Sequence, residues 1–127
     1  MSEEQGRAWL IAGALLAATG VLAGAFGAHA LAASLSPKAL AAWDTASRYQ
    51  IVHALALVCL GAQNVLPVRC LKSVAALLFF GTVLFSGSLY LLVLSTQSAW
   101  GMVTPLGGLM LVAGWLLLAW CAWRRRG

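Results

Sequence analysis

The residues of this chain that could do chemistry gather in the stretch "AWDTASRYQIVHALAL", residues 42–57. Asp44 stands four residues before Arg48, and Tyr49 stands four residues before His53, so each pair shares one face of a helix. A carboxylate beside a guanidinium can form an ion pair or meet an anionic group. An imidazole inside an apolar run can ligate a metal, carry a proton or form a hydrogen bond.

His29, in "GAFGAHAL", is the other histidine of the chain. Histidines on neighbouring membrane helices at one depth could ligate a haem iron or a copper or zinc ion. A neutral histidine can equally bond a backbone carbonyl or a tyrosine hydroxyl and so fasten the first helix to the second. No third ligand has recognisable spacing, so we assign no metal and no cofactor. Structural fastening is the prediction, and metal or haem binding and proton handling stay open.

Catalytic groups are not recognisable in this sequence. Asp44 is the one carboxylate side chain beyond Glu3 and Glu4, so acid–base chemistry with two carboxylates is excluded within one chain. No nucleophile–base pair and no phosphate-binding loop is present. We therefore predict that the protein is not an enzyme and has no catalytic residues.

Composition indicates that lipid is the solvent of this chain. Its 127 residues are 62% hydrophobic and 9% charged, with a mean hydropathy of +0.91. A single domain of this size cannot hide so much apolar surface from water. The net charge of +5 is scattered over segment ends rather than gathered in a basic stripe, so no nucleic-acid partner is expected.

Charge-free stretches locate the elements. Residues 8–37, 49–68 and 73–123 contain no charged side chain, and about 20 apolar residues cross the hydrocarbon as a helix. "STQSAWGMVTPLGG" divides the last stretch with Pro105 and three glycines. We predict an all-α integral membrane four-helix bundle that forms a single domain over residues 1–127. Its helices are expected near 8–33, 47–66, 73–94 and 105–123, with an interfacial helical segment at 37–46.

The basic residues predict how the chain is threaded. With four crossings, both termini and the 67–72 loop lie on one side of the membrane. That side has six basic residues, against two on the other, and such a bias marks the cytoplasm. The six are Arg7, Arg69, Lys72, Arg124, Arg125 and Arg126, and the two are Lys38 and Arg48. We expect a multi-pass protein of the cell (inner) membrane with cytoplasmic termini.

The first helix has a rival interpretation as a cleaved signal peptide. "GAHA" ends in an Ala-x-Ala pattern, which is typical of a cleavage site. Glu3 and Glu4 are balanced only by Arg7, and the apolar stretch 8–28 exceeds the usual core of such a peptide. These features favour a retained helix.

Two interpretations stand for the polar groups of the outer face. Asp44 and Arg48 form an exposed interfacial pair, or Arg48 is buried and either neutralised by Asp44 or free to meet an anionic headgroup. Ser86 and Ser88, in "LFSGSLYLL", return their hydrogen bonds to their own helix or bond across helices, and a substrate path is the further alternative. The candidate outer-face cluster is His29, Asp44, Arg48, Tyr49, His53, Ser86 and Ser88.

Small residues and cysteines bear on packing. One face of the first helix carries Gly13, Ala17, Gly20, Gly24 and Ala28, which predicts close helix packing, with a self-association seam as the alternative.

The chain has three cysteines, and no two of them form a Cys-x-x-Cys pair: Cys59, Cys70 and Cys121. The side of the membrane predicted to be cytoplasmic is reducing. The sequence therefore predicts neither a zinc site nor a structural disulfide.

The motifs "GAFGAHAL", "WDTASRYQIVHALAL", "LFSGSLYLL" and "VTPLGG" occur in this order within a resemblance that covers residues 10–120. Together they resemble the YgdD-like small bacterial inner-membrane proteins, a domain-of-unknown-function family with short eukaryotic transmembrane relatives. The resemblance implies a four-helix integral membrane protein with no established activity, and no functional residue comes with it.

The leading functional prediction is a non-enzymatic membrane component that contacts lipids and assembles with itself or with a larger membrane complex. A small transporter or channel is the first alternative. A haem- or metal-binding subunit that uses His29 and His53 is the second.

Overall fold

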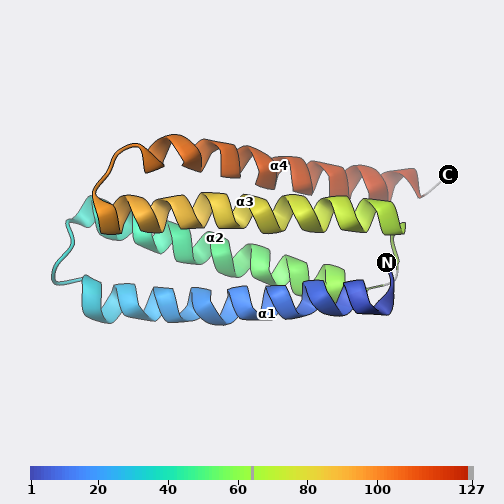
Figure 1. The fold of residues 1–127 in the computed structure, drawn as a ribbon, viewed down its shortest axis with the longest axis horizontal. Helices are drawn as coiled ribbons and strands as arrows, with labels where there is room; N and C mark the ends of the chain where they lie inside the picture. The colour runs from blue at the N-terminus through green and yellow to red at the C-terminus, as the bar shows by residue number, and fades with distance from the viewer. Residues whose placement is uncertain (64, 126–127) are drawn as a thin grey trace.

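The computed structural model describes residues 1–63 and 65–125 and shows four long antiparallel helices (Figure 1). Each helix packs against its neighbour in sequence, in the order α1, α2, α3, α4. Both termini lie at one end of the bundle, and the α1–α2 and α3–α4 connections lie at the other end (Figure 1). The predicted all-helical four-helix bundle is confirmed. Its elements are α1 (Glu3–Phe26), the π-helical turn η1 (Gly27–Leu31), α2 (Pro37–Ala62), α3 (Val68–Ser95) and α4 (Trp100–Arg124).

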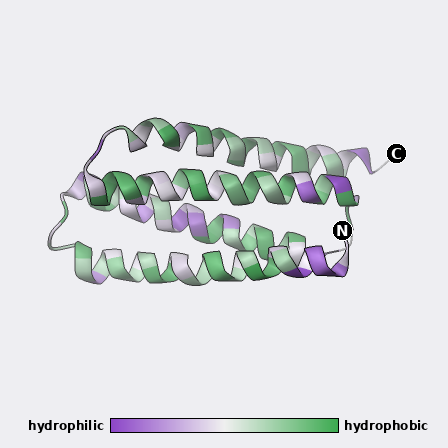
Figure 2. Ribbon diagram, viewed as in Figure 1, coloured by the Kyte–Doolittle hydropathy of each residue, from purple (hydrophilic) through white to green (hydrophobic). Residues whose placement is uncertain are grey.

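Three of the helical segments are long and apolar enough to cross a membrane. These are Glu3–Leu31, Val68–Ser95 and Trp100–Arg124. Helix α2 has 26 residues and is the polar member of the bundle. Figure 2 shows its hydrophilic stretch well inside the length of the bundle, between more hydrophobic neighbours. The apolar helices therefore meet lipid readily, whereas α2 needs partners for its polar side chains.

Helix α2 begins earlier than the sequence predicts. Ser36 is its N-cap and accepts a hydrogen bond from the Ala39 amide at 3.2 Å, and Pro37 occupies the first turn. Residues 37–46, expected as a separate interfacial segment, are the first turns of this one helix. The separate segment is wrong because Trp43 is buried against Gly27 of η1 and so belongs to the packed bundle.

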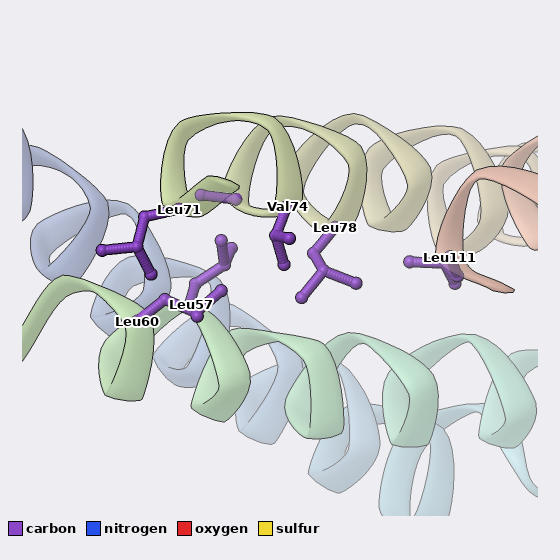
Figure 3. Close-up of a cluster of buried hydrophobic side chains, with 7 residues drawn as sticks. Leu57, Leu60, Leu71, Val74, Leu78 and Leu111 are labelled. Atoms are coloured by element: carbon purple, nitrogen blue, oxygen red, sulfur yellow. The ribbon is translucent and has the colours of Figure 1, made fainter. Parts of the chain in front are cut away.

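The hydrophobic core occupies the half of the bundle nearer the termini. Leucine and valine side chains of α2, α3 and α4 meet there (Figure 3). The largest fully buried ones are Leu57, Leu71, Val74 and Leu78. Lipid tails are as apolar as these side chains, so the hydrophobic effect does not hold the helices together. Close van der Waals packing of the buried side chains stabilises the contact between the helices instead.

A seam of glycines joins α1 to α2. Gly6, Gly13, Gly20 and Gly27 recur every seven residues and are all buried. A Cβ atom added at Gly13 would lie 2.7 Å from the Ala54 carbonyl oxygen, so the two backbones touch. A seven-residue repeat keeps one face of a helix against its partner along the whole contact.

The predicted small-residue face of the first helix needs correction at its C-terminal end. Gly13, Gly20 and Gly24 do lie against α2, and Ala17 is half-buried. Ala28 is exposed, and Gly27 takes its place in the contact. The predicted spacing ends with two steps of four residues, from Gly20 to Gly24 and to Ala28, which drift off the seam, whereas the seven-residue spacing stays on it. The glycine seam serves packing within the chain.

Cys70 and Cys121 form a disulfide that links the start of α3 to the end of α4. Their Cα atoms are 6.2 Å apart, within the ordinary range for such a bond. The prediction of no structural disulfide is wrong, because only the antiparallel pairing of α3 with α4 brings together cysteines 51 positions apart. Cys59 is free and exposed.

Replacing Gly13 by alanine tests the seam between α1 and α2. The added methyl group meets backbone atoms of Ala54 and Val58, so we expect a loss of about 1–3 kcal/mol in the free energy of unfolding. Gly87→Ala is the matched control, since nothing lies within 4 Å of its added Cβ. Thermal unfolding in detergent measures both variants. Equal melting temperatures for the two would show that the seam does not hold the helices at this distance.

Candidate functional site

Gln50 is the centre of the polar network inside the bundle. Its amide nitrogen donates to the Leu16 carbonyl and to the Thr19 hydroxyl, both at 2.9 Å. Its amide oxygen accepts from the Tyr90 hydroxyl at 2.8 Å. One buried side chain on α2 thus joins α1 and α3. The sequence reasoning did not single out Gln50, although an amide inside a membrane helix always requires partners.

Three further bonds fasten the same half of the bundle. The Trp43 indole N–H donates to the Ala23 carbonyl at 2.7 Å, joining α2 to α1. The Ser86 hydroxyl donates to the Ala46 carbonyl at 2.7 Å, joining α3 to α2. The hydroxyls of Ser88 and Thr104 lie 2.6 Å apart and join α3 to α4. Both candidate serines are buried and bond across helices, so neither lines an open path.

His53 fastens α2 to α4. The Trp115 indole N–H donates to Nε2 of His53 at 3.1 Å, and Nδ1 lies 2.6 Å from the Tyr49 carbonyl. Because an indole N–H only donates, Nε2 is the acceptor and Nδ1 carries the proton of a neutral ring. Both ring nitrogens are therefore engaged. From the sequence we predict that histidine fastens the first helix to the second. In the structure His53 bonds to α4 instead, because α4 packs beside it.

The structure does not bring His29 and His53 together. His29 is exposed in η1, two residues after Gly27, which packs on Trp43 of α2. His53 lies ten residues beyond Trp43, about 15 Å along the helix at 1.5 Å per residue. Iron or zinc held by both rings needs bonds of about 2 Å to each. The alternative of a haem or metal site formed by both histidines is therefore wrong.

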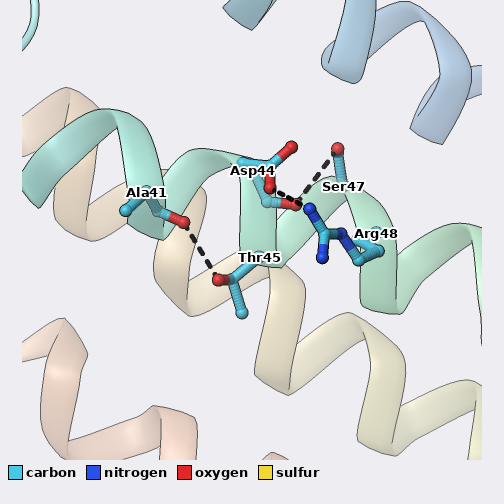
Figure 4. A network of polar contacts seen from close by, with 5 residues as sticks. All are labelled: Ala41, Asp44, Thr45, Ser47 and Arg48. Atoms are coloured by element: carbon cyan, nitrogen blue, oxygen red, sulfur yellow. Dashed lines mark hydrogen bonds and ion pairs between the residues drawn. The ribbon is translucent and has the colours of Figure 1, made fainter. Parts of the chain in front are cut away.

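Asp44 and Arg48 form an exposed ion pair on α2. Nη2 of Arg48 lies 2.6 Å from Oδ2 of Asp44, and the two side chains are 72% and 59% exposed (Figure 4). The interpretation of Arg48 as a buried residue is wrong, because most of its side chain is exposed. Among the described residues this is the one salt bridge.

The pair lies deeper along the bundle than the sequence indicates. Asp44 is seven residues and Arg48 eleven residues from Pro37, or about 10 Å and 16 Å along the helix axis. Helix α2 is about 39 Å long in all, against about 30 Å of hydrocarbon. Arg48 is thus within one turn of the midpoint of α2. The early start of α2 is what carries the pair inward.

A lateral groove runs between α2 and α4. Its volume is about 580 Å³, and its walls include His53, Phe85 and Trp115. Tyr49 is half-exposed on its rim, with its ring 4.8 Å from that of Phe85. The candidate cluster therefore divides into buried fasteners and exposed groups. His53, Ser86 and Ser88 are buried, and His29, Asp44, Arg48 and Tyr49 are exposed.

Long apolar helices around a hydrogen-bonded polar helix define an integral membrane bundle. The described residues hold no group of three or more metal-ligating side chains. The chain belongs to the family described as "Protein of unknown function (DUF423)", whose model matches residues 23–108. The finer YgdD-like name is not supported. No solved structure matches the chain.

The relatives of this chain are small membrane proteins. A UPF0382 membrane protein of Staphylococcus saprophyticus is 44% identical over 112 residues, which cover 88% of this chain and 93% of the relative. The UPF0382 membrane protein YwdK of Bacillus subtilis is 38% identical over 114 residues, with 88% and 93% covered. The chain is a membrane protein of a family with no assigned activity, and nothing indicates that it is an enzyme.

Replacing His53 by leucine tests the fastening of α2 to α4. The substitution leaves the Trp115 N–H without its acceptor in an apolar site, so we expect a loss of about 1–3 kcal/mol in the free energy of unfolding. His29→Leu, at an exposed position, is the control and should leave the melting temperature unchanged. Trp115→Phe made together with His53→Leu should recover part of the loss. An unchanged melting curve for His53→Leu alone would contradict the fastening role.

Proposed function

We propose that this protein is a non-enzymatic membrane component that assembles with a second copy of itself through the exposed face of α2. The observation that supports this proposal is the exposed Asp44–Arg48 pair, which lies about 10–16 Å along a helix of about 39 Å that is packed in a membrane bundle. A charged side chain near the bilayer centre costs about 3 kcal/mol on insertion scales, so such groups face protein or water. An ion pair that faces lipid is therefore unfavourable, and a protein partner that covers it removes this cost.

A second copy of the chain matches this face in charge. In a two-fold symmetric contact each Asp44 approaches the Arg48 of the other copy, because the same patch serves both sides. Val52 and Leu55 are more than half exposed and continue the face toward the other end of α2. Asp44 also borders a groove of about 440 Å³ whose lining includes Gly24 and Ala28. Small residues there admit side chains of a partner helix.

The other functional candidates lack a comparable observation. A transporter or channel needs polar groups around a wetted path, but Gln50, His53 and Ser86 are engaged in hydrogen bonds between helices. A haem or metal subunit needs free imidazole nitrogens, and those of His53 are both engaged. A larger membrane complex fits the α2 face as well, but charge complementarity favours a second copy.

The proposed location is the cell (inner) membrane, with both termini in the cytoplasm. The support is the basic bias of the end that carries the termini, where Arg69, Lys72 and Arg124 lie. The same end holds the Cys70–Cys121 disulfide, which opposes this orientation because cytoplasmic reductants would keep the two cysteines as thiols. Close contacts at Gly81, Gly107 and Gly114 hold α3 against α4 without the covalent bond.

The thiol state of Cys70 and Cys121 in cells tests this orientation. In a Cys59→Ala background, cells are quenched with acid and then treated with a maleimide of high mass. Two alkylated thiols per chain are expected for a cytoplasmic location, and the bond should close after extraction in air. A bond already present in freshly quenched cells would reverse the proposed orientation and leave the α2 contact unaffected.

Complementary charge variants test self-assembly through α2. Asp44→Lys gives one chain two positive charges at this position, and Arg48→Glu gives the other two negative charges. Each variant alone should shift from dimer to monomer in native mass spectrometry in mild detergent, because like charges face each other. When the two are expressed together with different tags, they should co-purify as a mixed dimer.

Lys38→Glu is the control, since it alters charge on the same helix near its exposed start, and it should leave the dimer intact. A neutral variant, Asp44→Asn with Arg48→Gln, is expected to be folded and to dimerise more weakly. A wild-type protein that is monomeric under the same conditions would refute self-assembly. Dimers of unchanged strength in both charge variants would refute the α2 contact while leaving self-assembly in place.

A further inference from the structure

All described charges of α3 and α4 are positive and lie at one end. Arg69 and Lys72 are in the first turns of α3, and Arg124 and Arg125 are at the end of α4. The chain has no acidic residue after Asp44, so nothing on these two helices offsets the four charges. None of the four forms a salt bridge with another described residue.

The fold brings these four charges into one corner. The Cα atoms of Cys70 and Cys121 are 6.2 Å apart, so the start of α3 touches the end of α4. Arg69 and Lys72 lie within two residues of Cys70, and the two arginines lie within about one turn of Cys121. Four like charges this close repel one another unless anions neutralise them.

Aromatic side chains place the same corner at the level of the lipid headgroups. Trp120 and Trp123 are exposed on the last turns of α4, and indole rings concentrate at membrane interfaces. The Arg124 guanidinium lies 4.9 Å from the centre of the Trp120 ring, which holds this cation beside the lipid-facing surface.

We propose that the α3–α4 corner is a binding site for the headgroup of an anionic phospholipid. Arg69, Lys72, Arg124 and Arg125 surround the lipid phosphate, and the acyl chains lie along the exposed apolar face of α4 beside Trp120. Arginine suits this role because its planar guanidinium binds phosphate oxygens in pairs. The site requires only that the bundle is embedded in a membrane, and it holds for either orientation and for monomer or dimer.

Lipid titration of the purified full chain tests the site. Native mass spectrometry in detergent should show phosphatidylglycerol bound more tightly than phosphatidylcholine. Arg124→Gln with Arg125→Gln should weaken phosphatidylglycerol binding about thirtyfold, from ~1 kcal/mol for each removed charge. The melting temperature of the wild-type protein should rise with phosphatidylglycerol and should not rise with inorganic phosphate.

Lys38→Gln is the matched control at the opposite end of the bundle and should bind phosphatidylglycerol as the wild type does. Arg69→Gln with Lys72→Gln removes the α3 half of the corner and should also weaken binding. Equal affinity for the two lipids, or equal phosphatidylglycerol binding by wild type and both double variants, would overturn the proposal. A response to inorganic phosphate alone would replace the lipid by a free anion and likewise overturn it.

Discussion

The contact between α1 and α2 is the interaction on which the rest of the structure depends. Helix α2 carries an amide, an imidazole, an indole and an ion pair into a membrane bundle, and lipid satisfies none of them. Glycines every seven residues let the α1 backbone approach closely enough for Gln50 to reach the Leu16 carbonyl and for Trp43 to reach the Ala23 carbonyl. Without this approach both donors would be buried unpaired, at a cost of about 1–3 kcal/mol each.

The bundle divides its two kinds of cohesion along its length. Hydrogen bonds from Gln50, Ser86 and Ser88 join the helices toward the end that carries the α1–α2 and α3–α4 connections, whereas leucine packing joins them near the termini. Hydrogen bonds between membrane helices average about 0.6 kcal/mol, so the number of bonds matters more than any single one. The directional hydrogen bonds fix how the helices are rotated at one end. At the end that carries the termini, the helices are held by the complementary shapes of their apolar side chains.

Two features of the molecule have no further partner among the residues that the structure describes. The exposed pair of Asp44 and Arg48 on α2 is the contact that we propose for a second copy, and the basic corner of α3 and α4 is the site that we propose for an anionic headgroup. They lie at different depths and on different helices, so a protein neighbour and a lipid headgroup can occupy them together. We therefore look for the function of this small protein in its contacts with the molecules that surround it in the membrane.

The sequence by itself determined the membrane environment, the all-helical class and the number of helices, because hydropathy and charge gaps act locally. It also placed Asp44 beside Arg48, since four residues make one helical turn. Only the tertiary structure decided that α2 is a single long helix, that His53 bonds Trp115 rather than α1, and that Cys70 meets Cys121. These outcomes depend on which helices become neighbours and in what register, and that is settled by packing between segments far apart in the chain.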